Sequence, residues 1–377
     1  MNTASPWFAP EYDILSTNIF SAIVKKKLKV ALQITLSLAL GAFFTWLFVW
    51  RLSPEEINEI WDAFKRADYL WLVVAFFIGI ASHWMRAVRS ILLLEPMGYR
   101  PTKMNAFFAT IIGYLANLAV PRLGEVLRCS ALAQYEKIPV SKSFGTVITE
   151  RIIDMVIYLL LFLFVLATSS ANLYQSIMGE IRSDHHEITF LSTESLLRLA
   201  GMAMGAAIVM ILLYFFVLRK KILKYAIVQK AENFVKSIWT SLKSIVQLKR
   251  PITFVVETLL IWILYYAGFY VCFFSLPETA VLTPDASLTA MAFATIGTIV
   301  VQGGIGVYPI FVAVTLKLLT KDSVNPVSYP VGYALGWLAW SAQQVAVIVV
   351  GTIAIICLPY YNRKRDGKNR NHQVENS

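Results

Sequence analysis

The chain has 377 residues, of which 57% are hydrophobic and 15% are charged. Because soluble globular proteins carry about 25% charged residues, this composition argues against a soluble protein. The formal net charge is +11, but the basic residues gather beside apolar runs, which is the positive-inside pattern of membrane proteins and not a nucleic-acid-binding patch.

Uncharged runs long enough to cross a bilayer recur along the chain, since a transmembrane helix needs about 20 apolar residues. They predict about six full spans, over residues 30–50, 69–85, 149–168, 199–218, 258–276 and 329–358. No small-residue cleavage site follows the first run, so we expect a retained span and not a signal peptide. The sequence therefore predicts an all-α polytopic membrane protein.

Loop charges predict the orientation of these spans. The basic end of segment 1–27 is expected in the cytoplasm, which puts the acidic segment 53–68 outside. Residues 179–194 are also acidic and are expected outside, whereas the basic segment 219–250 and the basic tail 359–377 are expected inside. Both termini are then cytoplasmic, and the protein is expected in the cell membrane.

Two further apolar segments must return to the side that they left. Residues 104–143 begin and end inside, and residues 286–325 begin and end outside. The first is broken at residues 117–121, and the second at residues 301–309, where three glycines and a proline permit conformations that a helix forbids. We therefore predict two re-entrant helical hairpins; the alternative is that both segments cross as full spans.

The two halves of the predicted membrane domain match in kind. The domain covers residues 28–358, and its halves cover about 28–168 and 195–358. Each half reads span, connector, span, broken hairpin, span, with the hairpins entering from opposite sides. Such an inverted repeat, with interrupted segments in corresponding positions, is typical of a transporter whose site lies near the membrane midplane.

Charged residues accompany the first hairpin and the next span. They are Arg122, Glu125, Arg128, Glu150, Arg151 and Asp154. We predict that Pro121 opens a half-helix from Arg122 to about Ala133, whose N-terminus and Arg122 suit a phosphate. The i,i+3 spacing predicts that Glu125 pairs with Arg122 and Arg128, and that Arg151 pairs with Asp154.

These six charges sum to zero and have two compatible interpretations. The ions lock the hairpin against the next span, or one or two arginines face a cavity and bind a lipid headgroup, because ionisable residues inside a membrane are costly.

Other polar and sulfur-bearing residues have simpler interpretations. Arg86 and Arg89 are expected to be snorkelling anchors at the end of the second span, and His83 is expected to be a satisfied interior histidine. The three cysteines, at 129, 272 and 357, are expected to pack, with no metal site. The stripe over residues 223–245 predicts an interfacial helix on the cytoplasmic leaflet or a connector packed on the bundle.

Three stretches carry a family resemblance: RAVRSILLL (86–94), NLAVPRLGEVLR (117–128) and TERIIDM (149–155). They resemble the lysylphosphatidylglycerol synthase transmembrane family, also called the flippase-like domain family, over roughly residues 28–358. The matching positions are Asn117, Pro121, Arg122, Gly124, Glu125, Arg128, Glu150, Arg151 and Asp154.

The second hairpin matches the family only in part. The family usually shows P-G-G-x-G-x-x-E, where this chain has Gln302, Gly303, Gly304, Gly306 and Pro309. The glycines match, whereas Gln302 and Pro309 replace the usual proline and glutamate. The resemblance implies that Asn117, the six charged residues, Gln302 and these glycines contribute to a lipid-headgroup site.

The resemblance also limits the expected activity. Larger members carry an aminoacyltransferase domain after the membrane part, whereas only residues 360–377 follow here. We expect movement of an anionic phospholipid or a polyprenyl-phosphate-linked lipid between leaflets, without a cofactor and without a nucleotide-binding loop. Two alternatives stay open: an intramembrane headgroup transferase with Glu125, Glu150 or Asp154 as base, and a non-catalytic partner of an envelope lipid enzyme. A homo-oligomer is a further expectation about partners.

Overall fold

The computed structural model describes residues 35, 39, 41–120, 122–183, 248–321 and 323–375, and within these ranges every regular element is a helix. Residues 41–49 are helical and precede α2 (Pro54–Arg66), α3 (Tyr69–Leu94), η1 (Glu95–Met97), α4 (Lys103–Ala119), α5 (Leu123–Glu136) and α6 (Val140–Ser183). The second half contains α10 (Pro251–Phe273), α11 (Pro277–Ala280), α12 (Pro284–Val300), η3 (Gln302–Gly304), α13 (Val307–Thr320) and α14 (Tyr329–Glu375).

Several helices in the described ranges are long and apolar enough to cross a membrane. They are Tyr69–Met97, Val140–Thr168, Pro251–Phe273 and Tyr329–Arg365. The prediction of an all-helical protein with several membrane-crossing helices is thus confirmed. The predicted span 199–218 and the stripe 223–245 lie outside the described residues, and so do residues 30–34, 36–38 and 40 of the predicted span 30–50.

Local sequence signals explain where the helices begin. The Ser53 hydroxyl accepts a hydrogen bond from the Glu56 amide at 3.2 Å, and the Ser53 amide donates to the Glu56 carboxylate at 2.8 Å. This reciprocal capping box satisfies two amides at the start of α2. Asp68 caps α3 and Thr102 caps α4 more simply, since in each a side-chain oxygen accepts one backbone amide, of Leu70 and of Asn105.

Two pairs of short helices stand between the long ones. α4 and α12 have 17 residues each, and α5 and α13 have 14 residues each. At about 1.5 Å per residue these helices are shorter than the roughly 30 Å hydrocarbon core. α4 packs against α5, and α12 packs against α13, so each pair is a helical hairpin.

Glycines allow the close contacts within and beside these hairpins. A Cβ at Gly124 would lie 1.9 Å from the carbonyl oxygen of Gly113. Gly303, Gly304 and Gly306 have φ angles of 71°, 74° and 75° in the turn between α12 and α13, a conformation that side-chain-bearing residues avoid. The predicted breaks thus fall at the turns of the two hairpins.

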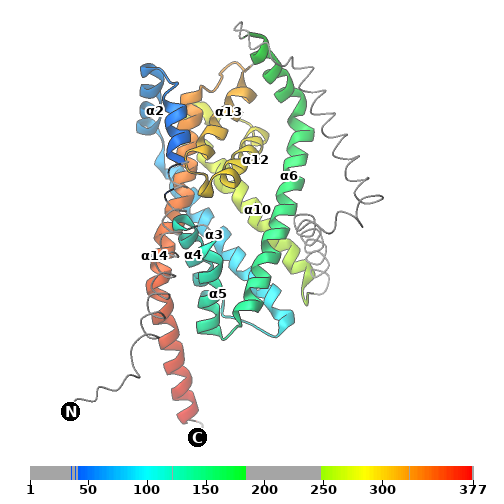
Figure 1. Cartoon of the computed structure of the whole chain (residues 1–377), viewed down its shortest axis with the longest axis vertical. Coiled ribbons are helices and arrows are strands. Elements are labelled where there is room, and N and C mark those ends of the chain that lie inside the picture. The colour runs from blue at the N-terminus through cyan, green and yellow to red at the C-terminus, as the bar shows by residue number, and fades with distance from the viewer. Residues whose placement is uncertain are drawn as a thin grey trace, which may run out of the picture.

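The hairpins lie toward opposite ends of the molecule (Figure 1). At one end, Arg66, the last residue of α2, pairs with Glu278 of α11, and the Asp68 amide donates to the Ser275 carbonyl at 2.8 Å. At the other end, Glu136 of α5 accepts hydrogen bonds from Thr102 and from Arg365 of α14, both at 2.8 Å. α6 and α14 run along most of the length of the molecule.

Two predicted helix boundaries are wrong. α14 continues through Pro359 to Glu375, past residue 358, where the last predicted span ends. A proline removes one backbone hydrogen bond from a helix, and packing against neighbouring elements can compensate for this loss. α6 begins at Val140, nine residues before the predicted position 149, directly after the short link from α5.

Candidate functional site

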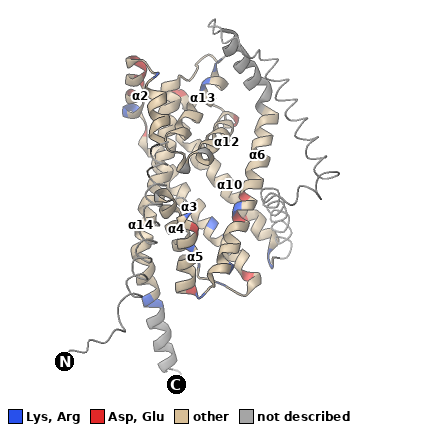
Figure 2. Ribbon diagram, in the orientation of Figure 1, with Lys and Arg blue, Asp and Glu red and all other residues tan. Residues whose placement is uncertain are grey.

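Charged residues are sparse along most of the described helices, but several gather where α3, α5 and α6 approach one another (Figure 2). We call this group the charge cluster. It consists of Arg86, Arg89, Glu125, Arg128, Glu150, Arg151 and Asp154, which are joined by ion pairs of 3.3 Å or less.

Arg128 and Glu150 form its most enclosed pair. The two guanidinium nitrogens of Arg128 donate to the two carboxylate oxygens of Glu150 at 3.0 and 2.9 Å. The Arg128 side chain is 8% exposed and that of Glu150 is 2% exposed. Glu125 was expected to pair with Arg128, but the structure gives Arg128 a partner on α6 instead. This bidentate pair ties the first hairpin to α6.

Asp154 pairs with two arginines of α3. Arg89 donates to both carboxylate oxygens, at 2.8 and 3.1 Å, and the Nη1 of Arg86 lies 2.9 Å from Oδ2. Both arginines are buried, so the prediction of snorkelling anchors is wrong. Their i,i+3 spacing puts both on one face of α3, and that face meets the carboxylate of α6.

The predicted pair between Arg151 and Asp154 is also wrong. Arg151 contacts Glu125 at 3.3 Å, and its side chain is 49% exposed. Asn117 supports this contact from α4, because its amide donates to Glu125 at 3.3 Å and its carbonyl accepts the Gly124 amide at 2.8 Å. Asn117 therefore joins the turn of the hairpin to the exposed edge of the charge cluster.

Arg122 occupies a different position from the predicted one. It is the exposed N-cap residue of α5, with a φ of 64°, and the helix begins at Leu123. The prediction that the half-helix starts at Arg122 and ends near Ala133 is therefore off at both ends, because α5 ends at Glu136. Pro121 lies outside the described residues. The left-handed conformation of Arg122 turns the chain into α5, and Glu125 pairs with Arg151 instead of Arg122.

Aromatic rings surround Arg86. Its guanidinium lies 5.3 Å from the ring centre of Tyr265 on α10 and 5.8 Å from that of Tyr114 on α4. Arg151 also lies 5.8 Å from the Tyr114 ring centre, and the His83 ring lies 4.8 Å from it. His83 was expected to be satisfied, yet its buried Nδ1 has no hydrogen-bond partner among the described residues.

Positive charge exceeds negative charge in the charge cluster. Four arginines pair with three carboxylates, because Arg86 and Arg89 share Asp154. The net charge of zero that the sequence analysis found for six residues did not include these two arginines of α3. Their signal in the sequence was the pair of arginines at i,i+3 near the end of an apolar span. A buried guanidinium without its own carboxylate favours a nearby anion.

The glycine-rich turn makes separate contacts. Gly303 and Gly304 lie in η3, together with Gln302, and η3 contacts α4. The Trp340 indole donates to the Gly303 carbonyl at 2.7 Å. Gly306 lies against Gly41, where a Cβ would be 2.4 Å from the Gly41 carbonyl oxygen. Among the described residues, no hydrogen bond or ion pair joins this turn to the charge cluster.

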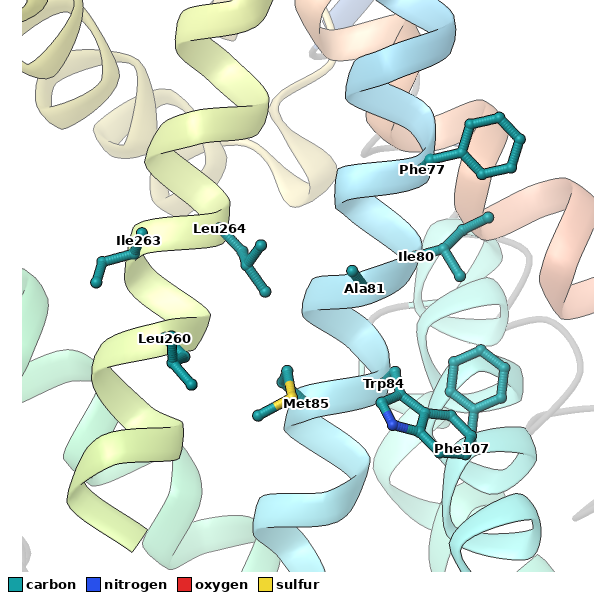
Figure 3. A pocket seen from close by; sticks show the side chains of 9 residues that line it. All are labelled: Phe77, Ile80, Ala81, Trp84, Met85, Phe107, Leu260, Ile263 and Leu264. Atoms are coloured by element: carbon teal, nitrogen blue, oxygen red, sulfur yellow. The ribbon is translucent and has the colours of Figure 1, made fainter. Parts of the chain in front are cut away.

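An apolar cavity of about 650 Å³ opens between α3 and α10 (Figure 3). It is lined by Phe77, Ile80, Ala81, Trp84, Met85, Phe107, Leu260, Ile263 and Leu264. Phe77, Ala81 and Trp84 share one face of α3, whereas Arg86 projects from the opposite side, by the period of 3.6 residues. The cavity therefore lies outside the charge cluster. In the described part of the chain, no three His, Cys, Asp or Glu residues are grouped to hold a metal.

Apolar helices around buried, paired charges define a polytopic membrane protein with an ionisable interior. Residues 34–326 match the family model described as the lysylphosphatidylglycerol synthase TM region, and the chain belongs to this family. This confirms the resemblance carried by the three sequence stretches.

A curated relative is the UPF0104 membrane protein MJ1595 of Methanocaldococcus jannaschii, which is 29% identical over 99 residues. The match covers 26% of this chain and 30% of that relative. No solved structure matches the chain.

Proposed function

We propose that the protein moves an anionic lipid between the two leaflets of its membrane, with the headgroup phosphate held at the charge cluster. The observation that carries this proposal is the sharing of Asp154 by two buried arginines. Two buried positive charges that share one negative charge are costly inside a membrane, and an anionic headgroup supplies a second negative charge. The family match supports a role that involves membrane lipids.

The edge of the charge cluster suits the entry of such a headgroup. Arg151 is about half exposed, and Arg122 is exposed at the start of α5. Arginine binds phosphate well because its planar guanidinium matches two phosphate oxygens. We assign Arg122 and Arg151 to the first encounter with the phosphate. Arg128, Glu150, Glu125 and Asn117 hold the hairpin in position beside them.

We further propose that both hairpins are re-entrant and that the two halves form an inverted repeat. The order of long helix, short pair and long helix occurs twice, as α3, α4–α5, α6 and as α10, α12–α13, α14. The short helices have the same lengths in both halves. Contact between η3 and α4 supports a meeting of the two halves inside the bundle, where Gln302, Gly303, Gly304 and Gly306 shape the second turn.

Purified protein in liposomes tests the proposed function. Labelled phosphatidylglycerol should equilibrate between leaflets faster than labelled phosphatidylcholine, which has no net charge, and faster than in liposomes without protein. Mass spectrometry should find the headgroup unchanged. Chemical conversion of the lipid by the protein alone would support a transferase, whereas neither movement nor conversion would support a non-catalytic partner.

A further inference from the structure

The two arginines that share Asp154 are held very differently. Arg89 is 0% exposed, donates to both carboxylate oxygens, and also lies 3.4 Å from the hydroxyl of Thr258. Arg86 reaches only an oxygen that Arg89 already contacts, since its Nη1 and the Arg89 Nη2 both lie near Oδ2. Loss of Arg86 from Asp154 therefore leaves that carboxylate with a bidentate partner.

Contacts with aromatic rings hold the Arg86 guanidinium independently of Asp154. Tyr114 and Tyr265 face its guanidinium at 5.8 and 5.3 Å. A guanidinium is attracted to the faces of aromatic rings, and this attraction strengthens when water is excluded. Its buried Nε has no hydrogen-bond partner among the described residues. Arg86 thus keeps donor capacity for a second anion.

Tyr114 also connects Arg86 to the exposed edge of the charge cluster. The guanidinium groups of Arg86 and Arg151 each lie 5.8 Å from the centre of the Tyr114 ring. Arg151 is 49% exposed, whereas Arg86 is 6% exposed. Tyr114 therefore contacts both an exposed arginine, Arg151, and a buried arginine, Arg86.

We propose that Arg86 is the arginine that exchanges partners, leaving Asp154 for a phosphate oxygen of an anion that arrives from the side of Arg151. Arg89 keeps Asp154 throughout and is a positioning residue. This inference rests on the proposed function for its ligand, a phosphate-bearing lipid headgroup. Free inorganic phosphate has the same recognition chemistry, so the experiment separates the two sources.

Glutamine variants distinguish the two arginines. Arg86→Gln should keep the thermal stability of the wild type in detergent but lose at least about tenfold in movement of labelled phosphatidylglycerol, since a hydrogen bond to a charged group contributes about that factor. Arg89→Gln should lose stability. Lys65→Gln removes a positive charge from an exposed site on α2 and should change neither property.

Asp154→Asn provides a second, opposite readout. Without this carboxylate both Arg86 and Arg89 lack their negative partner, so native mass spectrometry should find more phosphatidylglycerol retained than on the wild type. Arg86→Gln should retain less. An excess of inorganic phosphate should displace the lipid only slightly; complete displacement would identify free phosphate as the ligand and overturn the lipid assignment.

The failures of the two proposals differ. If the wild type moves lipid and Arg86→Gln moves it equally fast, the role of Arg86 is overturned and the proposed function stands. A wild type that moves no lipid but retains phosphatidylglycerol through Arg86 would overturn transport and leave the subsite standing. An Arg86→Gln variant as unstable as Arg89→Gln would make Arg86 a structural residue.

Discussion

At the residue scale, arginines that look alike in the sequence differ in their burial and in the ion pairs that they form. Arg128 is enclosed and bidentate with Glu150, whereas Arg151 is half exposed and makes a longer contact with Glu125. Removing one partner of a buried pair leaves the other charge without compensation, which costs far more than the loss of an exposed pair.

We therefore expect Arg128→Gln to lower the free energy of unfolding by about 3–5 kcal/mol, and Arg151→Gln to lower it by less than about 1 kcal/mol. Thermal unfolding in detergent measures both. The double variant Arg128→Gln/Glu150→Gln should recover part of the loss, because neither charge is then left alone. Equal losses for the two single variants would contradict this ranking.

At the element scale, the first hairpin depends on a close approach between α4 and α5. Gly124 sits against the backbone of Gly113 and the side chain of Asn117, with no room for a Cβ. The same contact lets Asn117 accept the Gly124 amide and support Glu125. Gly124 is therefore needed both for the packing of α4 against α5 and for the contacts of Asn117 at the edge of the charge cluster.

Gly124→Ala should destabilise the protein by at least about 1–3 kcal/mol, the usual cost of forcing extra volume into a packed interior. Gly145→Ala is the matched control, since Gly145 also lies in a helix but no atom would lie within 4 Å of its added Cβ. That change should be neutral or stabilising by up to about 1 kcal/mol, because alanine is the better helix former. If Gly124→Ala unfolds at the same temperature as the wild type, α4 and α5 can move apart without loss of stability.

At the scale of the whole molecule, polar contacts tie separate parts of the chain together at two opposite ends. Arg66 and Glu278 mark one end, and Glu136 and Arg365 mark the other. The sequence predicted that segment 53–68 lies outside and that the C-terminal tail lies inside. The same loop-charge argument predicts that both termini are cytoplasmic and that the protein lies in the cell membrane. The boundaries of the membrane domain, at residues 27 and 358, are also predictions from the sequence.

Single cysteines in a cysteine-free background test this orientation in intact cells. Lys65→Cys, on exposed α2, should react with a membrane-impermeant reagent added outside. Gln134→Cys, exposed near the end of α5, should react only after the membrane is opened, because a re-entrant hairpin returns its end to the inside. Labelling of residue 134 from outside would mean that the first hairpin crosses the membrane.

The sequence alone was enough for the helical class and for the positions of the turns. Long apolar runs have no stable alternative to helix in a membrane, because every backbone group must find its partner within the segment. The glycines at 303, 304 and 306 likewise indicated the second turn, since few other residues adopt a positive φ. Within the first predicted site, Glu125 contacts Asn117 and Arg151, and Arg128 contacts Glu150, whereas Asp154 pairs with arginines of α3 and Arg122 is exposed at the start of α5.

Only the tertiary structure decided which charges pair. Helical periodicity tells which residues share a face, but it does not tell which helix that face meets. Arg86 and Arg89 look like anchors in the sequence because the carboxylate that holds them, Asp154, lies on α6, 65 residues beyond Arg89. Arg151 likewise lies three residues from Asp154 yet pairs with Glu125. Ion pairs depend on distance in space, and the packing of α3, α5 and α6 sets those distances.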